Sequence, residues 1–175
     1  MSSWLLIQLK LATPYYSFIK NGWKFIMLDS VHLDMDNTWY IGKLGDEQFA
    51  WLQTELQNTP ATMPVCVLSH IPILSATLMV DDIAYGSNKW EILGGDTHTD
   101  TSKIVDLFYL HPNVKLCLSG HIHLRDKVVY NNVTYICNGA VSGAWWEGNK
   151  RQTAAGYGLI DFYADGTFTE QYINY

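Results

Sequence analysis

Short apolar runs that end in polar residues recur along the chain. The clearest are WKFIMLDS (residues 23–30), PVCVL (residues 64–68) and VKLCLSG (residues 114–120). Apolar runs of this length are typical of strands that are buried on both faces, as in a parallel sheet. Pro72 prevents further pairing shortly after the second run. The pattern therefore predicts three buried strands that each lead into a loop.

Hydrophobic side chains recur at helical spacing in two other stretches. In residues 46–57 they are Phe49, Leu52 and Leu56, and the same spacing resumes over residues 104–110 after the polar run DTHTDTS. Acidic residues begin the first stretch and several N-cap residues precede the second, as expected at the starts of helices. Each helix is thus predicted to connect one buried strand to the next.

Alternating polar and apolar positions mark two hairpins near the C-terminus. One is KVVYNNVTYICNGAV (residues 127–141), and the other pairs residues 157–163 with residues 167–173. Residues 74–95 carry no regular pattern and are predicted to form a long loop. The order of these elements predicts an α/β layered fold in which polar residues gather at the carboxyl ends of the strands.

Composition indicates a folded chain with one core. Of the 175 residues, 48% are hydrophobic and 16% are charged, so we expect a single domain over residues 1–175. Cys66, Cys117 and Cys137 lie inside apolar runs, and their odd number predicts buried thiols and no disulfide framework.

Charge limits the classes of partner. The net charge is −6, and the largest basic cluster is the pair Lys150-Arg151, which excludes binding to a nucleic-acid backbone or to anionic lipid. The N-terminal stretch MSSWLLIQLKLA is interrupted by Lys10 and lacks a basic start. We therefore expect neither a signal peptide nor a membrane anchor, and the cytoplasm is the default compartment.

Candidate chemistry lies just past the ends of the three predicted strands. Asp29 follows the first strand, His70 the second, and His121 and His123 the third. Ligands bind at that edge in open α/β sheets, and imidazole is a good ligand for Zn, Fe and Mn. A His-x-His pair on a turn can direct its rings to different partners or to two adjacent metal ions.

The segments SHIPI (residues 69–73) and SGHIH (residues 119–123) together resemble the calcineurin-like metallophosphoesterase family. PYYSFIKNGWKFIMLDS (residues 14–30) is similar to a hairpin of that family, and IGKLGDEQFAWLQTEL (residues 41–56) is similar to the loop and helix that follow it in the bacterial phosphohydrolase branch. The resemblance extends from Pro14 to the C-terminus.

The resemblance implies a β-sandwich flanked by helices and a site with two Mn, Fe or Zn ions. In this family His70 and His121 would bind one metal and His123 the other. Such a site hydrolyses phosphate mono- or diesters with a metal-activated water. A small phosphate ester is the implied substrate, and no catalytic acid or base is assigned.

Three further motifs of the family, Asp-x-His, Gly-Asp-x-x-Asp and Gly-Asn-His-Asp, are not found ahead of the hairpin in this sequence. The family places them before the hairpin, where this chain has the non-family segment of residues 1–13. We therefore expect the C-terminal part of the fold without its first βαβ units, and an incomplete dinuclear site. A substitute strand in residues 1–13 is an alternative for the exposed sheet edge, and otherwise we expect a homo-oligomer.

Several assignments stay open at this point. The alternative to an enzyme is a degenerate, inactive phosphoesterase domain that serves as a binding or scaffold module. Asn138 could contact phosphate or only form a turn, and Trp145 and Trp146 could stack on an aromatic substrate or pack internally. The three remaining histidines match no motif and are interpreted as surface or loop residues: His32, His98 and His111.

Overall fold

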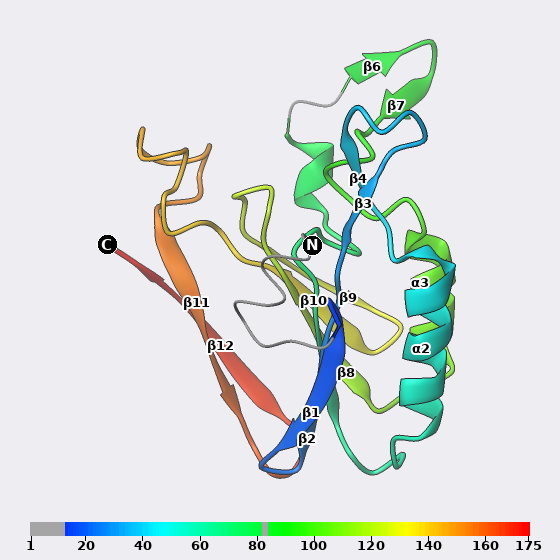
Figure 1. The fold of residues 1–175 in the computed structure, drawn as a ribbon. Helices are drawn as coiled ribbons and strands as arrows, with labels where there is room; N and C mark the ends of the chain where they lie inside the picture. The colour runs from blue at the N-terminus through cyan, green and yellow to red at the C-terminus, as the bar shows by residue number, and fades with distance from the viewer. Residues whose placement is uncertain (1–12, 82–83) are drawn as a thin grey trace.

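A six-stranded sheet forms the centre of the protein. The computed structural model describes residues 13–81 and 84–175, and Figure 1 shows its layers. In spatial order the strands of the sheet are β1 (Tyr16–Lys20), β2 (Trp23–Met27), β5 (Val65–Leu68), β8 (Val114–Ser119), β10 (Val133–Cys137) and β9 (Asp126–Tyr130).

The four inner strands run in the same direction. β2 pairs with β5, β5 with β8 and β8 with β10, all in parallel, whereas β1 and β9 are antiparallel strands at the two edges. The three apolar runs thus become the neighbouring strands β2, β5 and β8, as predicted. Because all four inner strands end at the same edge, the residues that follow them are brought together there.

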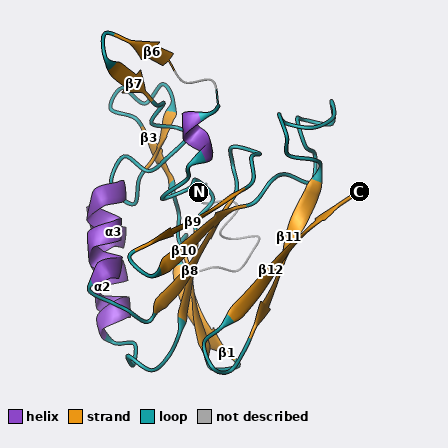
Figure 2. Cartoon of the chain, turned by 180° about the vertical axis from the view of Figure 1, so that it is seen from behind, coloured by secondary structure: helices purple, strands orange, loops and turns teal. Residues whose placement is uncertain are grey.

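Two helices cover one face of this sheet. They are α2 (Gly45–Gln57) and α3 (Thr101–Tyr109), and they lie on the same side in Figures 1 and 2. Leu52 and Leu56 of α2 and Ile104 and Phe108 of α3 pack in one core cluster with Val67 of the sheet. Both predicted helices are confirmed, and each connects one parallel strand to the next.

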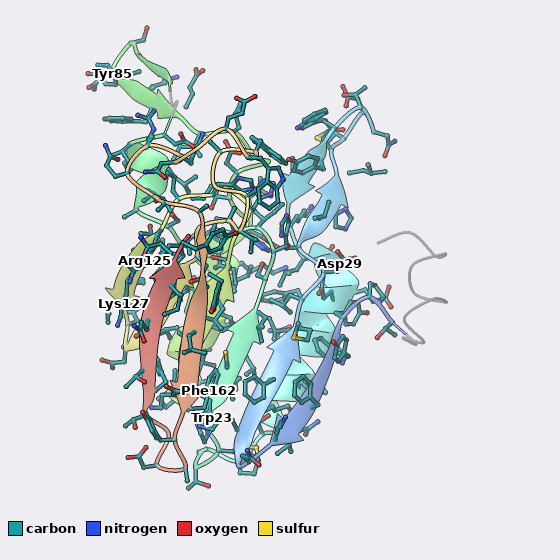
Figure 3. All side chains as sticks on the ribbon, turned by 90° about the vertical axis from the view of Figure 1, so that its left-hand side faces the viewer. Trp23, Asp29, Tyr85, Arg125, Lys127 and Phe162 are labelled. Atoms are coloured by element: carbon teal, nitrogen blue, oxygen red, sulfur yellow. The ribbon has the colours of Figure 1, made fainter. Side chains whose placement is uncertain are left out.

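A long hairpin covers the opposite face. It consists of β11 (Gly156–Phe162) and β12 (Phe168–Asn174), and its side chains pack on a cluster that includes Trp23 and Cys66. The Trp23 indole donates a hydrogen bond to the carbonyl of Tyr163 at 2.7 Å, and its ring meets Phe162 edge to face at 4.9 Å (Figure 3). The molecule is therefore layered as helices, sheet and hairpin, which confirms the predicted α/β fold class.

A buried ion pair connects the sheet to α2. The Lys24 ammonium lies 2.5 Å from a carboxylate oxygen of Glu55, and their side chains are 9% and 23% exposed. The Ser17 hydroxyl donates a second hydrogen bond to the same oxygen at 2.5 Å. Burial alone would raise the pKa of Glu55, but the contacts with Lys24 and Ser17 outweigh it and hold that pKa below its ordinary value.

Two short ribbons extend beyond the carboxyl edge. β3 (Val31–Leu33) pairs with β4 (Tyr40–Gly42), and β6 (Ala84–Gly86) pairs with β7 (Lys89–Glu91) after the 3-10 turn η1 (Thr77–Met79). The prediction of an irregular loop over residues 74–95 was therefore wrong in part. Three-residue strands bury too little to leave an alternating pattern in the sequence.

Other predictions about the chain have different outcomes. All three cysteines are buried free thiols, as predicted. Within residues 13–81 and 84–175, neither helix nor the 3-10 turn has the length and apolar character that a membrane crossing requires. The substitute strand proposed for residues 1–13 lies almost wholly outside the described residues. On the edge strand β1, Phe18 is 43% and Ile19 60% exposed, so self-association stays a prediction that size-exclusion chromatography can check.

Candidate functional site

The carboxyl edge of the parallel strands brings together most of the predicted site residues. His70 lies two residues beyond β5 and His121 two residues beyond β8, and Asn138 directly follows β10. The His70 carbonyl accepts a hydrogen bond from the Gly120 amide at 3.1 Å, so the two histidine loops are joined by their backbones. Asp29, two residues beyond β2, instead lines a cavity of about 590 Å³ at the start of α2 (Figure 3).

His70 and His121 are in direct contact. Their nearest nitrogens, Nε2 of His70 and Nδ1 of His121, are 3.0 Å apart, and the rings meet edge to face with centroids 4.8 Å apart. Burial lowers the pKa of His70, and the nearby His123 lowers it further. Burial is also the main cause of the lowered pKa of His121, followed by the repulsion from His70. Both rings are thus favoured in the neutral form, which is the form that binds metal ions.

The His-x-His segment has an unusual backbone. His121 and His123 have φ angles of 73° and 58°, in the left-handed region that residues other than glycine rarely adopt. Between them, Ile122 is buried and fixes the segment in the core. Strained backbone of this kind is concentrated at functional sites, where surrounding contacts hold it. Nine other non-glycine residues of the described chain also have positive φ angles, so this backbone identifies a tight turn at the carboxyl edge.

His123 belongs to a neighbouring part of the same edge. Its Nδ1 donates a hydrogen bond to the Gly143 carbonyl at 2.8 Å, so Nε2 is the nitrogen left to bind another group. The Trp145 ring lies against it, with centroids 4.7 Å apart. Trp145 and Trp146 are 77% and 75% exposed, so internal packing does not account for either side chain. Trp145 therefore offers an open aromatic face beside His123.

Asn138 has a buried amide oxygen for which no hydrogen-bond partner is found among the described residues. Its side chain packs against the backbone of Gly158 in β11, where an added Cβ would lie 2.2 Å from the amide oxygen. Asn138 and His70 line the same open cavity of about 400 Å³. Asn138 and His70 thus border the same cavity, and the Asn138 amide lies against the hairpin strand β11.

Three residues that the sequence did not single out also lie at the site. The Tyr40 hydroxyl is 3.5 Å from Nε2 of His121, and Asp96 is close enough to oppose part of the lowering of the His121 pKa. His98 lies in a loop, as one of its two interpretations had it, but it is 2% exposed and bonds to side chains on both sides of its ring, so it is not a surface residue. A long-range contact between loops buries it, and this leaves no local pattern. One sign in the sequence was the His-x-Asp spacing of His98 and Asp100.

The spacing of the histidine nitrogens can be compared with metal geometry. Zn–N bonds are about 2.0–2.1 Å long, so two ligands in a tetrahedral site are roughly 3.3 Å apart. The nearest nitrogens of His70 and His121 are 3.0 Å apart, which is a hydrogen-bonding distance close to that ligand spacing. No group of three or more His, Cys, Asp or Glu side chains able to hold a metal is found within residues 13–81 and 84–175.

Comparison with known proteins places this fold and site in context. No family profile matches the chain. A 3',5'-cyclic-nucleotide phosphodiesterase from Nostoc sp. is 29% identical over 170 residues, covering 94% of this chain and 57% of that protein. The 3',5'-cyclic adenosine monophosphate phosphodiesterase CpdA from Vibrio vulnificus is 23% identical over 124 residues, covering 71% of this chain and 39% of that protein. The chain thus spans about half the length of these curated relatives.

A solved structure supports the same relationship at the level of the fold. A dimetal phosphatase from Danio rerio superimposes with a TM-score of 0.58 at 13% identity, covering 95% of this chain and 59% of that one. The fold of this chain is therefore similar to that of a dimetal phosphatase. Together with the phosphodiesterase matches, it shows that the chain is related to the metallophosphoesterase family, which confirms the resemblance seen in the sequence.

Proposed function

We propose that this protein is a metal-dependent phosphohydrolase that acts on phosphate mono- or diesters, with His70, His121 and His123 as metal ligands. The observation that carries the proposal is the pair of neutral imidazoles of His70 and His121, 3.0 Å apart at the carboxyl edge of the parallel strands. Their spacing suits one Mn, Fe or Zn ion. A cation bound there would polarise a phosphoryl oxygen and lower the pKa of a bound water.

The residues around this pair would orient it. Tyr40 lies beside the second nitrogen of His121, so a hydrogen bond donated by Nε2–H to its hydroxyl oxygen would leave the lone pair of Nδ1 directed at His70. The Gly143 carbonyl holds His123 through Nδ1, which leaves Nε2 available as a ligand. A hydrogen bond donated by the other ring nitrogen is the usual way that proteins fix the tautomer and direction of a metal-binding histidine.

The substrate would be a phosphate ester with an aromatic group. The relatives from Nostoc sp. and Vibrio vulnificus are named as phosphodiesterases of cyclic nucleotides, and this chain has aromatic faces suited to a base. Trp145 contacts His123 and is largely open to solvent, and Trp146 is adjacent. Stacking on these rings and a hydrogen bond from Asn138 to phosphate would place the ester over the histidines.

A second candidate function follows from the absence of a larger ligand group. We propose that the dinuclear site supplied by this chain is incomplete, since residues 13–81 and 84–175 provide no group of three or more metal-binding side chains. A two-metal site needs carboxylates to balance the charge of its cations. The chain would then act as a binding or scaffold module that retains the fold and binds a phosphate ester without turnover.

Metal content and turnover of the full chain distinguish the two functions. The protein is purified with Mn²⁺, Fe²⁺ or Zn²⁺ supplied, and bound metal is measured together with hydrolysis of bis(p-nitrophenyl) phosphate and 3',5'-cyclic AMP. The variants are His70→Ala and His121→Ala. His111→Ala is the matched control, because His111 follows α3 at the opposite end of β8.

The enzyme proposal expects bound metal and turnover that are lost in both site variants and kept in the control. The binding module would be favoured if the unaltered chain binds metal without turnover and the site variants lose that metal. A folded chain with no bound metal under any of these conditions would refute the assignment of the histidines as ligands.

A further inference from the structure

A chain of buried polar side chains lies behind His70. The Ser69 hydroxyl is 3.0 Å from Nε2 of His98, and Nδ1 of the same ring is 3.0 Å from a carboxylate oxygen of Asp100. Ser69 is 6% exposed, and the His98 side chain is completely buried. Buried polar groups must be hydrogen-bonded to be tolerated, so a connected set of three in this place calls for a structural reason.

The order serine, histidine, aspartate is that of a hydrolytic triad, but Ser69 is not a nucleophile. Its hydroxyl is 2.6 Å from the Ile71 carbonyl, which only accepts hydrogen bonds, so the single hydroxyl proton is directed there. The Ser69 oxygen is then left to accept a hydrogen bond from Nε2 of His98, and the Asp100 carboxylate lies beside Nδ1 of the same ring. Solvent and substrate have almost no access to the hydroxyl. The arrangement is therefore suited to holding backbone in place.

The backbone that it holds carries His70. The bond from Ser69 to the Ile71 carbonyl spans the residue between them, and the Ser69 amide donates to the Leu118 carbonyl of β8 at 3.0 Å. On the other side, the Ile71 amide donates to the Ser30 hydroxyl at 3.0 Å. The main chain on both sides of the His70 side chain is thus fixed by hydrogen bonds, and one of them depends on a hydroxyl that His98 orients.

Asp100 fixes the position of His98. One carboxylate oxygen bonds to His98, and the other accepts the Leu44 amide at 3.1 Å, directly before α2. Burial alone would raise the pKa of Asp100, but the hydrogen bonds from His98 and Leu44 outweigh it and keep the pKa below its ordinary value. The His98 amide also donates to the Pro72 carbonyl at 3.1 Å. The ring is therefore held between the starts of both helices and the His70 loop.

From this geometry we propose that His98, oriented by Asp100, is a positioning residue that holds the His70 imidazole against His121 through Ser69. The consequence for metal binding rests on the proposed function, whereas the placement of the His70 ring does not. Groups that orient metal-binding histidines typically change metal affinity about 10- to 100-fold when they are removed. Loss of the Ser69 hydroxyl should weaken the binding of a cation at His70 by that factor.

Two measurements on the full chain test this proposal. Long-range ¹H–¹⁵N NMR spectra of the histidine rings report the contact between His70 and His121, with His70→Gln used to assign the signals. A titration with Co²⁺ alone, followed by visible absorption, gives the metal affinity. The variant is Ser69→Ala. The matched control is Ser75→Ala, which removes another buried serine hydroxyl from the same loop, one that bonds to Asp126 and Thr77.

In Ser69→Ala we expect the His70 nitrogen signals to move toward those of a free, tautomer-averaged imidazole, and Co²⁺ binding to weaken about 10- to 100-fold. In Ser75→Ala both should stay unchanged. His98→Gln is the second variant, since an amide can still donate to Ser69 but lacks the ring nitrogen that bonds to Asp100. Its effect should lie between those of the unaltered protein and Ser69→Ala, and it decides the question if Ser69→Ala does not fold.

The outcomes separate this proposal from the proposed function. In one outcome the His70 signals move in Ser69→Ala, but the unaltered chain binds no Co²⁺. This would support the positioning role and refute metal binding. In another outcome the unaltered chain binds Co²⁺, but both variants keep the His70 signals unchanged and change the Co²⁺ affinity less than twofold. This would overturn the positioning role alone. Equal changes in Ser69→Ala and Ser75→Ala would also overturn it, because any buried hydroxyl of the loop would then have the same effect.

Discussion

The ion pair of Lys24 and Glu55 allows a quantitative prediction for Glu55→Gln. The substitution keeps the shape of the side chain but leaves the Lys24 ammonium buried, with a neutral amide in place of its carboxylate. Removing one partner of a buried ion pair costs about 3–5 kcal/mol. Because 23% of the Glu55 side chain reaches solvent, water can compensate in part, and we expect a loss of about 3 kcal/mol.

For a domain of this size, each kcal/mol lowers Tm by about 2–4 °C, so Glu55→Gln should lower it by about 6–12 °C. Urea denaturation at pH 7, followed by far-ultraviolet circular dichroism, gives the free energy of unfolding directly. The double variant Lys24→Met with Glu55→Leu removes both charges and should lose less than about 1 kcal/mol, because apolar pairs often replace buried ion pairs without loss. A double variant that is less stable than Glu55→Gln would refute this reasoning.

Three further predictions concern stability. The pKa of Glu55 is lowered in the folded state, so the unfolded chain binds more protons. The contribution of Glu55 to stability is therefore fully present above the ordinary glutamate pKa of about 4.3. It is lost as the pH falls through the lower folded value. Glu55→Gln should flatten this part of the stability curve in denaturation series between pH 3 and 6, and an unchanged slope would contradict the assignment. Gly42→Ala would place a Cβ 2.4 Å from the Thr97 carbonyl oxygen. The resulting strain should lower the free energy of unfolding by about 1–3 kcal/mol, measured by urea denaturation. No loss of stability would mean that the loop carrying His98 moves freely. Trp23→Phe removes the bond to the Tyr163 carbonyl and should cost about 2 kcal/mol by the same assay, whereas a loss below about 0.5 kcal/mol would show that this bond does not hold the hairpin.

The central part of the fold could be predicted from the sequence because its elements have strong local patterns. Apolar runs became β2, β5 and β8, and helical spacing identified α2 and α3 to within a few residues. Once the strands were taken as parallel, the clustering of His70 with His121 followed, since residues after neighbouring parallel strands must meet at one edge. The contact between their rings depends on side-chain geometry and required the structure.

The parts that could not be predicted depend on contacts between distant segments. His98 lies in a polar run and becomes buried only because its loop packs against Gly42 and Pro72. Asp29 follows a strand as His70 does, yet Gln48 of α2 binds its backbone and its side chain lines a different cavity. The left-handed backbone at His121 and His123 likewise has no counterpart in hydrophobic periodicity, which describes faces of elements and not individual φ angles.

Each face of the central sheet contains a cysteine whose reactivity depends on the layer that covers it. Cys66 of β5 points toward the β11–β12 hairpin, whereas Cys117 of the adjacent strand β8 packs on the helix side. Burial raises the pKa of Cys66 to about 12, so it reacts with thiol reagents only when its layer opens. Among the described strands, β11 and β12 pair only with each other, and such a unit can open without global unfolding. Alkylation of Cys66 should therefore precede that of Cys117, and the difference in rates measures how readily the hairpin leaves the sheet.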